Sequence, residues 1–549
     1  MIKRILIVLA VGLVTSFVAA EEVAVGLVPK PVAMKLLGGS FKIDSATEIV
    51  YDGADLERTG KQLSAYLEPA MGFALKTKAG RAAANGILIT TQGASEKLGD
   101  EGYVLSVHEN GIVVKARTAQ GAFYGIQSIR QLLPVAVFGD DPVKAEWTVP
   151  CLDIADMPRF SWRAFMLDEG RYFKGMAVVK DILEEMALLK MNVYHWHLVD
   201  DQGWRIEIKK YPKLTEIGSK RPGTSAKKNN ETEHNGIPHE GFYTQEQIKE
   251  IVKYAADLHI SVIPEIEMPG HASASIAAYP EMGSTDEKVE VPVSFGRKLH
   301  CYNVADQKVY DMLVDILDET IALFPADVLH IGGDEVNYSQ WDKNAMIQEY
   351  MAKHGLKDGK ELQVHFLNRM SKTLESKGRR MMGWNEILGI DEGDIKRGTV
   401  KEVELSKKAI IHFWKGDADL AKEAAKRGYD VVNSLHHYTY LDYNFGRLTL
   451  QKAYEYDPMF EGLEPQYHKN IIGIGCQMWG ETIPGVKNMQ LKMHPRMLAF
   501  AEMGWTPQAS REYYEFEKRI DYHCQRYQLT GVAYVTGQGR NSWRNKKKK

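Results

Sequence analysis

Two adjacent carboxylates stand where an apolar segment meets two glycines, in the sequence HIGGDEV at residues 330–336. Asp334 and Glu335 at the end of a strand would suit general acid and base chemistry, which relies on carboxyl groups held in different environments. Neighbouring side chains on a regular strand point to opposite faces, so both acids can reach one pocket only if Gly332 and Gly333 let the backbone bend. Taken alone, such a pair more often marks a helix N-terminus, where acids complement the helix dipole.

Further polar and aromatic residues favour a pocket at the same end of the fold. Aromatic walls with charged hydrogen-bonding groups suit a sugar ring, because the ring has apolar faces and equatorial hydroxyls. The candidates are three tryptophans at predicted strand ends (Trp384, Trp414 and Trp479), Tyr440 beyond another strand, and the charged residues Arg171, Asp442 and Glu481.

The elements that must position these residues are short β-rich segments alternating with amphipathic helices, from about residue 159 to about 505. Eight candidate strands are found, and the reactive residues fall at their C-terminal ends, as in parallel barrel enzymes. We therefore predict an α/β fold, a (β/α)8 TIM barrel that forms the catalytic domain at residues 159–510 and is preceded by a smaller α+β domain. The predicted strands are 164–168, 192–199, 261–267, 328–334, 380–384, 409–414, 430–435 and 472–479, and the predicted helices include 244–258, 309–323, 361–376 and 420–427.

The rest of the chain divides into three further parts. Residues 1–20 have Lys3 and Arg4, an apolar run at 5–18 and small residues at 19–20, which predicts a secretory signal and a periplasmic or extracellular protein. A membrane anchor is the alternative, but the run is short for a full span. Residues 21–158 are expected to form an α+β domain, with β-rich runs at 86–90 and 102–107 and a helix at 119–133, and residues 511–549 a C-terminal helical segment with a basic tail.

Composition narrows the class of partner. The 69 Lys and Arg nearly balance the 72 Asp and Glu, so no strong field favours nucleic acid, and a neutral glycan fits better. No membrane partner is expected once the signal is removed. The four cysteines are too widely spaced for a metal knuckle, and they leave open one or two disulfides or buried thiols; they are Cys151, Cys301, Cys476 and Cys524.

Seven ordered segments resemble glycoside hydrolase family 20, the β-N-acetylhexosaminidases, over most of the chain. They are MLDEGRYF at 166–173, NVYHWHLVDDQGWR at 192–205, IPEIEMPGH at 263–271, HIGGDEV at 330–336, GWNE at 383–386, YLD at 440–442 and MWGE at 478–481. Upstream, GAFYGIQ at 121–127 resembles the non-catalytic N-terminal domain of that family.

The resemblance implies an exo-acting enzyme that removes terminal β-linked N-acetylhexosamine with retention of configuration and no cofactor or metal. Glu335 would protonate the leaving oxygen and then activate water, while Asp334 orients the substrate's acetamido group, whose oxygen attacks the anomeric carbon to give an oxazolinium.

The remaining site residues take supporting roles by the same resemblance. Tyr440 would hold the acetamido oxygen, the three tryptophans would wall the pocket, and Arg171, Asp442 and Glu481 would bind ring hydroxyls. Asp200 and His271 are expected to form a supporting pair behind Glu335, with Glu267 bridging in the same layer. Glu267 departs from the family pattern, because several relatives carry Asp there.

Two other functions remain to be weighed. His195 and His197 would lie on one face of a strand, and His271, His330 and Asp334 could complete a metal site in a metal-dependent barrel hydrolase. An inactive carbohydrate-binding protein would use the same stacking residues, but it would have no need of a general acid beside an acetamido clamp. The polar stretch at 219–241 is the expected shaper of subsites beyond the first sugar.

Overall fold

The computed structural model describes residues 25–81, 85–296, 298–398 and 405–537. The expected signal at residues 1–20 and the basic run from Lys546 to Lys549 lie outside these ranges. Within them, no helix combines the length and the apolar character needed to cross a bilayer. All four cysteines are among the described residues; each is buried and none forms a disulfide.

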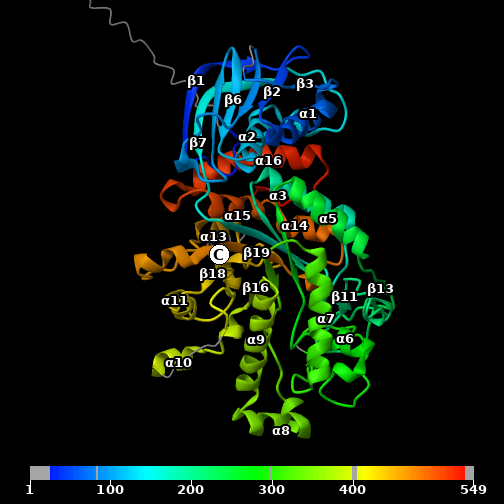
Figure 1. Cartoon of the computed structure of the whole chain (residues 1–549). Helices are drawn as coiled ribbons and strands as arrows, with labels where there is room; N and C mark the ends of the chain where they lie inside the picture. Colours follow the sequence, from blue (N-terminus) through cyan, green and yellow to red (C-terminus); the bar gives the residue numbers. More distant parts are fainter. Residues whose placement is uncertain (1–24, 82–84, 297, 399–404, 538–549) are drawn as a thin grey trace, which may run out of the picture.

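The N-terminal part of the chain forms a mixed seven-stranded sheet with the order β1-β7-β5-β6-β4-β2-β3. Every second side chain of β5 and β6 is buried, as expected for strands that pack one face on a core. Helices α1 (Glu57–Met71) and α2 (Ala119–Leu132) pack against this sheet on the side of the barrel (Figure 1). The strands are β1 (Ala33–Lys42), β2 (Glu48–Asp52), β3 (Lys76–Ala79), β4 (Gly86–Thr90), β5 (Tyr103–His108), β6 (Gly111–Ala116) and β7 (Thr148–Asp156).

The eight predicted strands close into a parallel barrel, which confirms the predicted fold class. Their side chains are almost all buried, because the core fills the inside and helices cover the outside. The strands are β8 (Trp162–Asp168), β9 (Val193–His197), β14 (Ser261–Glu265), β15 (Val328–His330), β16 (Arg380–Trp384), β17 (Ile410–Phe413), β18 (Asp430–Asn433) and β19 (Ile471–Met478).

The four predicted barrel helices all form, with ends shifted by a few residues. The best-defined start is that of α5, where Thr244 and Gln247 make a reciprocal capping box. The longer helices are α3 (Met176–Leu188), α5 (Gln245–Asp257), α7 (Gln307–Leu323), α8 (Ala345–His354), α9 (Gly359–Ser376) and α15 (Arg496–Trp505). Shorter ones are α4 (Lys213–Glu216), α6 (Ser273–Ala278), α10 (Glu392–Arg397), α11 (Ala418–Lys426), α12 (His436–Thr439), α13 (Leu450–Glu455) and α14 (Val486–Met493).

The C-terminal helix α16 (Tyr513–Leu529) lies between the two domains (Figure 1). Arg526 makes two hydrogen bonds of 2.7 Å to the buried carboxylate of Glu185 on α3. On the other side, Tyr522 donates to the backbone of Leu133, which follows α2 (2.7 Å). The helix therefore joins the sheet domain to the barrel.

The longest connection between consecutive barrel strands is the one between β9 and β14. It contains two small antiparallel ladders, β10 (Val199–Asp200) with β11 (Gly203–Trp204) and β12 (Lys220–Arg221) with β13 (His239–Glu240). The polar stretch between β12 and β13 is tied to the loop before α7, since the backbone of Asn229 donates to Phe295 (2.9 Å). This loop pair forms part of the rim described next.

Candidate active site

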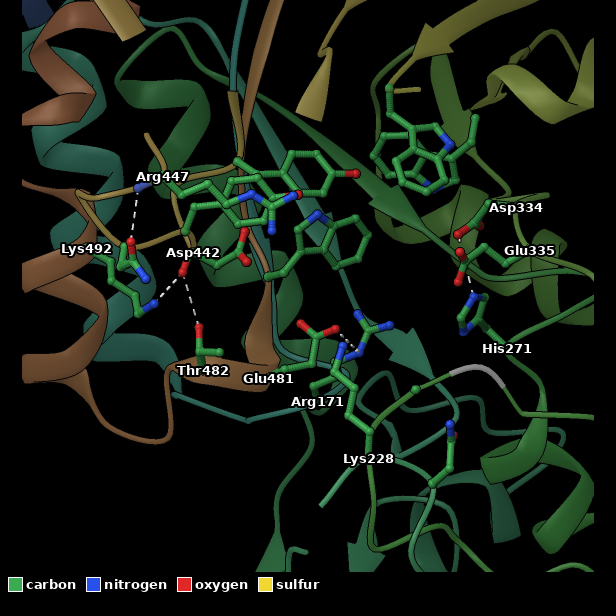
Figure 2. A pocket seen from close by; sticks show the side chains of 18 residues that line it. Arg171, Lys228, His271, Asp334, Glu335, Asp442, Arg447, Glu481, Thr482 and Lys492 are labelled. Carbon is green, nitrogen blue, oxygen red and sulfur yellow. Dashed lines mark hydrogen bonds and ion pairs between the residues drawn. The ribbon is translucent and has the colours of Figure 1, made fainter. Parts of the chain in front are cut away.

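A cavity of about 720 Å³ opens beyond the C-terminal ends of the barrel strands. Figure 2 shows Asp334, Glu335 and His271 on one side of it and Asp442 and Glu481 on the other. Asp200 and Glu267 lie behind its wall. The predicted site residues that line it are Arg171, His271, Asp334, Glu335, Trp384, Trp414, Tyr440, Asp442, Trp479 and Glu481.

The bend that both acids require is present in the backbone. Strand β15 ends at His330, and Gly332 and Gly333 then adopt φ values of +67° and +91°. Glu335 itself has a φ of +51°, which is uncommon for a residue with a side chain. The chain thus leaves the strand direction at the glycines, and Asp334 and Glu335 both face the cavity.

Gly332 also provides space for the acid behind the site. A Cβ atom at this position would lie 1.7 Å from Glu267 Oε2. Glu267 is buried and its Oε1 is 3.2 Å from His197 Nε2. Burial, with further contributions from Asp334 and Glu265, raises the pKa of Glu267 well above its ordinary value. The longer acid at this position is accommodated because position 332 has no side chain.

His271 connects Asp334 to two further carboxylates. Its Nδ1 lies 3.3 Å from Asp200 Oδ1 and 3.1 Å from Asp201 Oδ2, and its Nε2 faces Asp334 Oδ2 at 3.5 Å. Burial alone would lower the pKa of His271, but Asp200 and Asp334 outweigh it and hold the pKa well above the ordinary value. His271 thus contacts Asp200, and the cavity acid that its ring faces directly is Asp334. One ring nitrogen of His271 and one carboxylate oxygen each of Asp334 and Glu335 lie within 4.8 Å of one another.

Arg171 is held by three acids at the floor of the cavity. Its guanidinium is 2.9 Å from Asp168 Oδ2, 3.0 Å from Asp200 Oδ2 and 3.7 Å from Glu481 Oε1. It also lies 5.0 Å from the centre of the Trp479 ring, within cation–π range. These contacts fix a positive charge beside an aromatic face.

The aromatic residues make a continuous wall. Trp384 is only 1% exposed, stacks on His412 with ring centres 4.1 Å apart, and donates its indole N–H to Glu265 (2.8 Å). The rings of Trp414 and Tyr440 are nearly parallel at 6.2 Å, and Trp479 is 5.8 Å from Tyr440. Trp414 is oriented by a 2.9 Å hydrogen bond to Glu386. The wall therefore has a fixed shape.

The metal alternative does not assemble as the sequence suggested. His195 Nε2 is 2.7 Å from Glu265, whose other oxygen is 2.9 Å from His330 Nδ1. His197 lies closer to Glu267 (3.2 Å) and Asp168 (3.3 Å) than to Glu265 (3.8 Å). Among the described residues, no group that could hold a metal combines His195 with His197 or with His271. The His195–Glu265–His330 cluster is buried and does not line the cavity. These imidazoles therefore contact buried carboxylates inside the barrel and not the cavity.

Several residues that line the cavity were not predicted from the sequence. Lys228 and Asn229 belong to the polar stretch that was expected to shape outer subsites, but no pattern singled them out. The others have no signal in a single sequence, because they lie outside the strand ends; they are Gly296, Tyr443, Asn444, Arg447, Thr482 and Lys492.

Comparison with known families and proteins agrees with this geometry. The family model described as glycosyl hydrolase family 20, catalytic domain, matches residues 160–508, and that for domain 2 of the same family matches residues 24–157. A beta-hexosaminidase of Porphyromonas gingivalis is 34% identical over 93% of this chain, which spans 64% of that relative's length. A beta-N-acetylhexosaminidase of Cellulomonas fimi is 29% identical, over 93% of this chain and 96% of the relative.

Solved structures show the same relationship. A mutant Streptomyces plicatus beta-hexosaminidase in complex with its product GlcNAc has a TM-score of 0.81 and 29% identity, covering 94% of this chain and 97% of the other. Flavobacterium johnsoniae chitobiase has a TM-score of 0.76 and 32% identity, covering 92% and 73%. With both domains matched in order by family models, the chain belongs to glycosyl hydrolase family 20, the β-N-acetylhexosaminidases.

Proposed function

We propose that this glycoside hydrolase releases terminal, non-reducing β-linked GlcNAc or GalNAc by a retaining mechanism in which the substrate's acetamido group is the nucleophile. One observation carries the proposal: Asp334 and Glu335, adjacent in sequence, face one cavity that Tyr440 and three tryptophans also line. A sugar with an N-acetyl group needs this combination of an acid, an amide-binding group and an apolar wall.

Glu335 is the proposed acid and base. It would protonate the glycosidic oxygen as the bond breaks and later take a proton from the attacking water. The acetamido carbonyl attacks the anomeric carbon from within the substrate, so no protein carboxylate has to become a nucleophile. Two inversions at the same carbon give net retention.

Asp334 is the proposed partner of the acetamido N–H and of the positive charge that develops on the oxazolinium ring. It lies on the acid side of the cavity, 3.5 Å from the imidazole of His271. The raised pKa of His271 makes that ring a cation beside the Asp334 carboxyl group. Tyr440, in the aromatic wall, would donate its hydroxyl to the acetamido oxygen.

The opposite side of the cavity supports recognition of a chain end. Arg171, Asp442 and Glu481 offer charged hydrogen-bonding groups to the hydroxyls of one ring (Figure 2). Buried groups that bind the hydroxyls of the non-reducing end favour a terminal sugar over an internal one. The leader-like sequence at residues 1–20 supports the further proposal that the protein is exported to the periplasm or the medium.

A cyclic thiazoline analogue of N-acetylglucosamine tests the mechanism. It mimics the oxazolinium, so the wild-type protein should bind it at least about a hundredfold more tightly than the parent sugar. Asp334→Asn should erase much of that preference and should slow hydrolysis strongly, because the intermediate loses its counter-charge in a shielded site. A 2-fluoro glycoside trapped as a covalent adduct on an active-site carboxylate would overturn the proposal.

Dialysis against a chelator separates this mechanism from a metal-dependent one. The proposed chemistry uses only side chains and the substrate, so full activity should remain after the treatment. Activity that disappears and returns with a divalent cation would favour the metal-dependent alternative.

A further inference from the structure

The segment from Tyr440 to Leu448 carries two of the proposed substrate-binding groups without being part of a helix or a long strand. It follows α12, makes a single bridge from Tyr440 to Gln477, and continues as turns until α13. Tyr440 and Asp442 both line the cavity. Within the segment, the backbone hydrogen bonds close only local turns, such as those from Tyr443 to Tyr440 and from Leu448 to Asn444, so side chains from outside it also hold its carbonyls in place.

Arg496, at the start of α15, supplies most of that support. Its buried guanidinium donates hydrogen bonds to the backbone carbonyls of Leu441 (2.6 Å), Tyr443 (2.8 Å) and Leu448 (2.9 Å). The first two of these carbonyls flank Asp442 directly. The guanidinium also lies 4.1 Å from the ring centre of Phe445. One side chain thus ties the two ends of the segment to the barrel.

Lys492, on α14, acts at Asp442 itself. Its ammonium donates a hydrogen bond to the backbone carbonyl of Asp442, to which Thr482 also donates (3.4 Å), as Figure 2 shows. Lys492 and Asp442 both line the cavity, and the positive charge of Lys492, held at the Asp442 backbone, acts to lower the pKa of the Asp442 carboxyl group. The buried Asp442 Oδ1 accepts no hydrogen bond from any described residue, which leaves it available to a ligand.

Charged groups on three elements act on the pKa of Asp442, and their effects have opposite directions. Burial and the negative charge of Glu481 raise the pKa of Asp442 to about 7, while Lys492 and Arg496 act to lower it. On the same segment, Tyr440 and Tyr443 have raised pKa values because of burial and stay neutral. Without Lys492, the ionised form of Asp442 would therefore be lost at a higher pH.

We propose that Lys492 and Arg496 are positioning residues for sugar recognition: Arg496 fixes the segment that carries Tyr440 and Asp442, and Lys492 keeps Asp442 in place as an ionised hydroxyl acceptor. This inference rests on the proposed function, in which Asp442 binds a ring hydroxyl of the terminal sugar. By this inference, helices α14 and α15, which follow the last barrel strand, contribute to the KM of the enzyme.

The test is the pH dependence of KM and kcat for an aryl β-N-acetylglucosaminide. Lys492→Met should raise KM at pH 7 by about fivefold and at lower pH by up to about tenfold, as expected if the pKa of Asp442, about 7 in the wild type, rises by one further unit, with a smaller change in kcat. The loss should grow as the pH falls and shrink as it rises, because protonation of Asp442 removes the acceptor. Lys492→Arg should keep most of the wild-type profile, since it preserves the charge and a donor.

A matched control and a double variant isolate the contact. Lys487 is exposed on the same helix α14, so Lys487→Met should leave both parameters unchanged. Asp442→Asn should abolish the dependence of KM on this ionisation, and adding Lys492→Met to it should raise KM little further. Arg496→Lys should raise KM, while the melting temperature should change little, because lysine keeps the buried positive charge and one donor.

The inference and the proposed function can fail separately. A wild-type protein without hexosaminidase activity would refute the proposed function. An active wild type whose Lys492→Met variant matches Lys487→Met, or loses affinity equally at every pH and also in the Asp442→Asn background, would overturn the role of Lys492. An Arg496→Lys variant with unchanged KM would overturn the role of Arg496.

Discussion

Replacing Gly332 by alanine is expected to damage catalysis, although neither Gly332 nor the neighbouring Glu267 lines the cavity. The backbone at Gly332 has a φ of +67°, and an added Cβ would lie 1.7 Å from Glu267 Oε2. Both the strained backbone and the clash act on the turn that aims Asp334 and Glu335. The variant therefore tests whether this turn is set by the space that Glu267 occupies.

The magnitude follows from two separate costs. A residue with a side chain in the left-handed region costs about 1–2 kcal/mol. Since carbon contacts are normally about 3.5 Å, the Glu267 carboxylate must also move by more than about 1 Å. That movement breaks its 3.2 Å contact with His197, a hydrogen bond to a charged imidazole worth about 1.5–3 kcal/mol. We expect a loss of about 2.5–5 kcal/mol in the free energy of unfolding, measured by urea titration.

Activity should fall more than stability alone would suggest. A displacement of about 1 Å in the catalytic turn can reduce the rate by about a hundredfold, so kcat should drop to that extent in folded Gly332→Ala protein. Gly355→Ala is the matched control, because Gly355 has a similar φ of +66° and open space around the added Cβ. It should lose only about 1–2 kcal/mol of stability and keep wild-type kcat.

A second substitution should reverse the effect. Glu267→Asp shortens the acid and makes room for the new methyl group, so the double variant should regain part of the lost kcat. If Gly332→Ala loses no more stability than Gly355→Ala and retains wild-type kcat, the coupling between Glu267 and the turn does not exist. A double variant that is worse than either single one would argue against the steric explanation.

Three further predictions concern the acid, the aromatic wall and the domain contact. Glu335→Gln should lower kcat by about a hundredfold to ten-thousandfold for poor leaving groups and much less for activated aryl groups, and equal losses for both would show that Glu335 is not the acid. Trp479→Ala should raise KM and lower kcat, and near wild-type values for both would place this ring in the core instead of the subsite. Burial would raise the pKa of Glu185, but Arg526 lowers it to about 2, so its stabilising effect should be complete above about pH 5 and disappear as the pH falls toward 2. Melting temperatures of wild type and Glu185→Gln should converge over that range, and a constant difference between them would contradict the linkage.

The barrel could be predicted because its signals are local. Each strand is a short apolar segment followed by a polar or aromatic residue, and strand β16 occurs at the predicted residues. Strand β15 is shorter than predicted, three residues ending at His330, because the two glycines take positive φ values and leave the ladder early. The same glycines were the reason to expect a bend, so the catalytic turn was predicted more accurately than the strand that leads to it.

The supporting contacts could not be predicted, since they join residues that are distant in sequence. Nothing in the sequence around Arg496 shows that its guanidinium reaches the carbonyl of Leu441, and nothing around His195 shows that Glu265 takes both it and His330 as partners. A His-x-His pair on one strand fits a metal site and a buried ion-pair network equally well. The two kinds of site are distinguished only by the neighbouring strand β14, which brings Glu265 between His195 and His330.

The charges around the cavity alternate in sign, and this order determines which functions a substitution at one of these residues should affect. Arg171 lies between Asp200 and Glu481, and His271 lies between Asp200 and Asp334. Asp200 therefore partners two cations on opposite sides of the cavity, the side proposed to bind ring hydroxyls and the side proposed to hold the reacting acetamido group. Removing one partner of a buried pair leaves the other charge uncompensated, at a cost of about 3–5 kcal/mol. A change at Asp200 should thus disturb sugar binding and turnover together, whereas a change at Glu481 acts on the binding side alone.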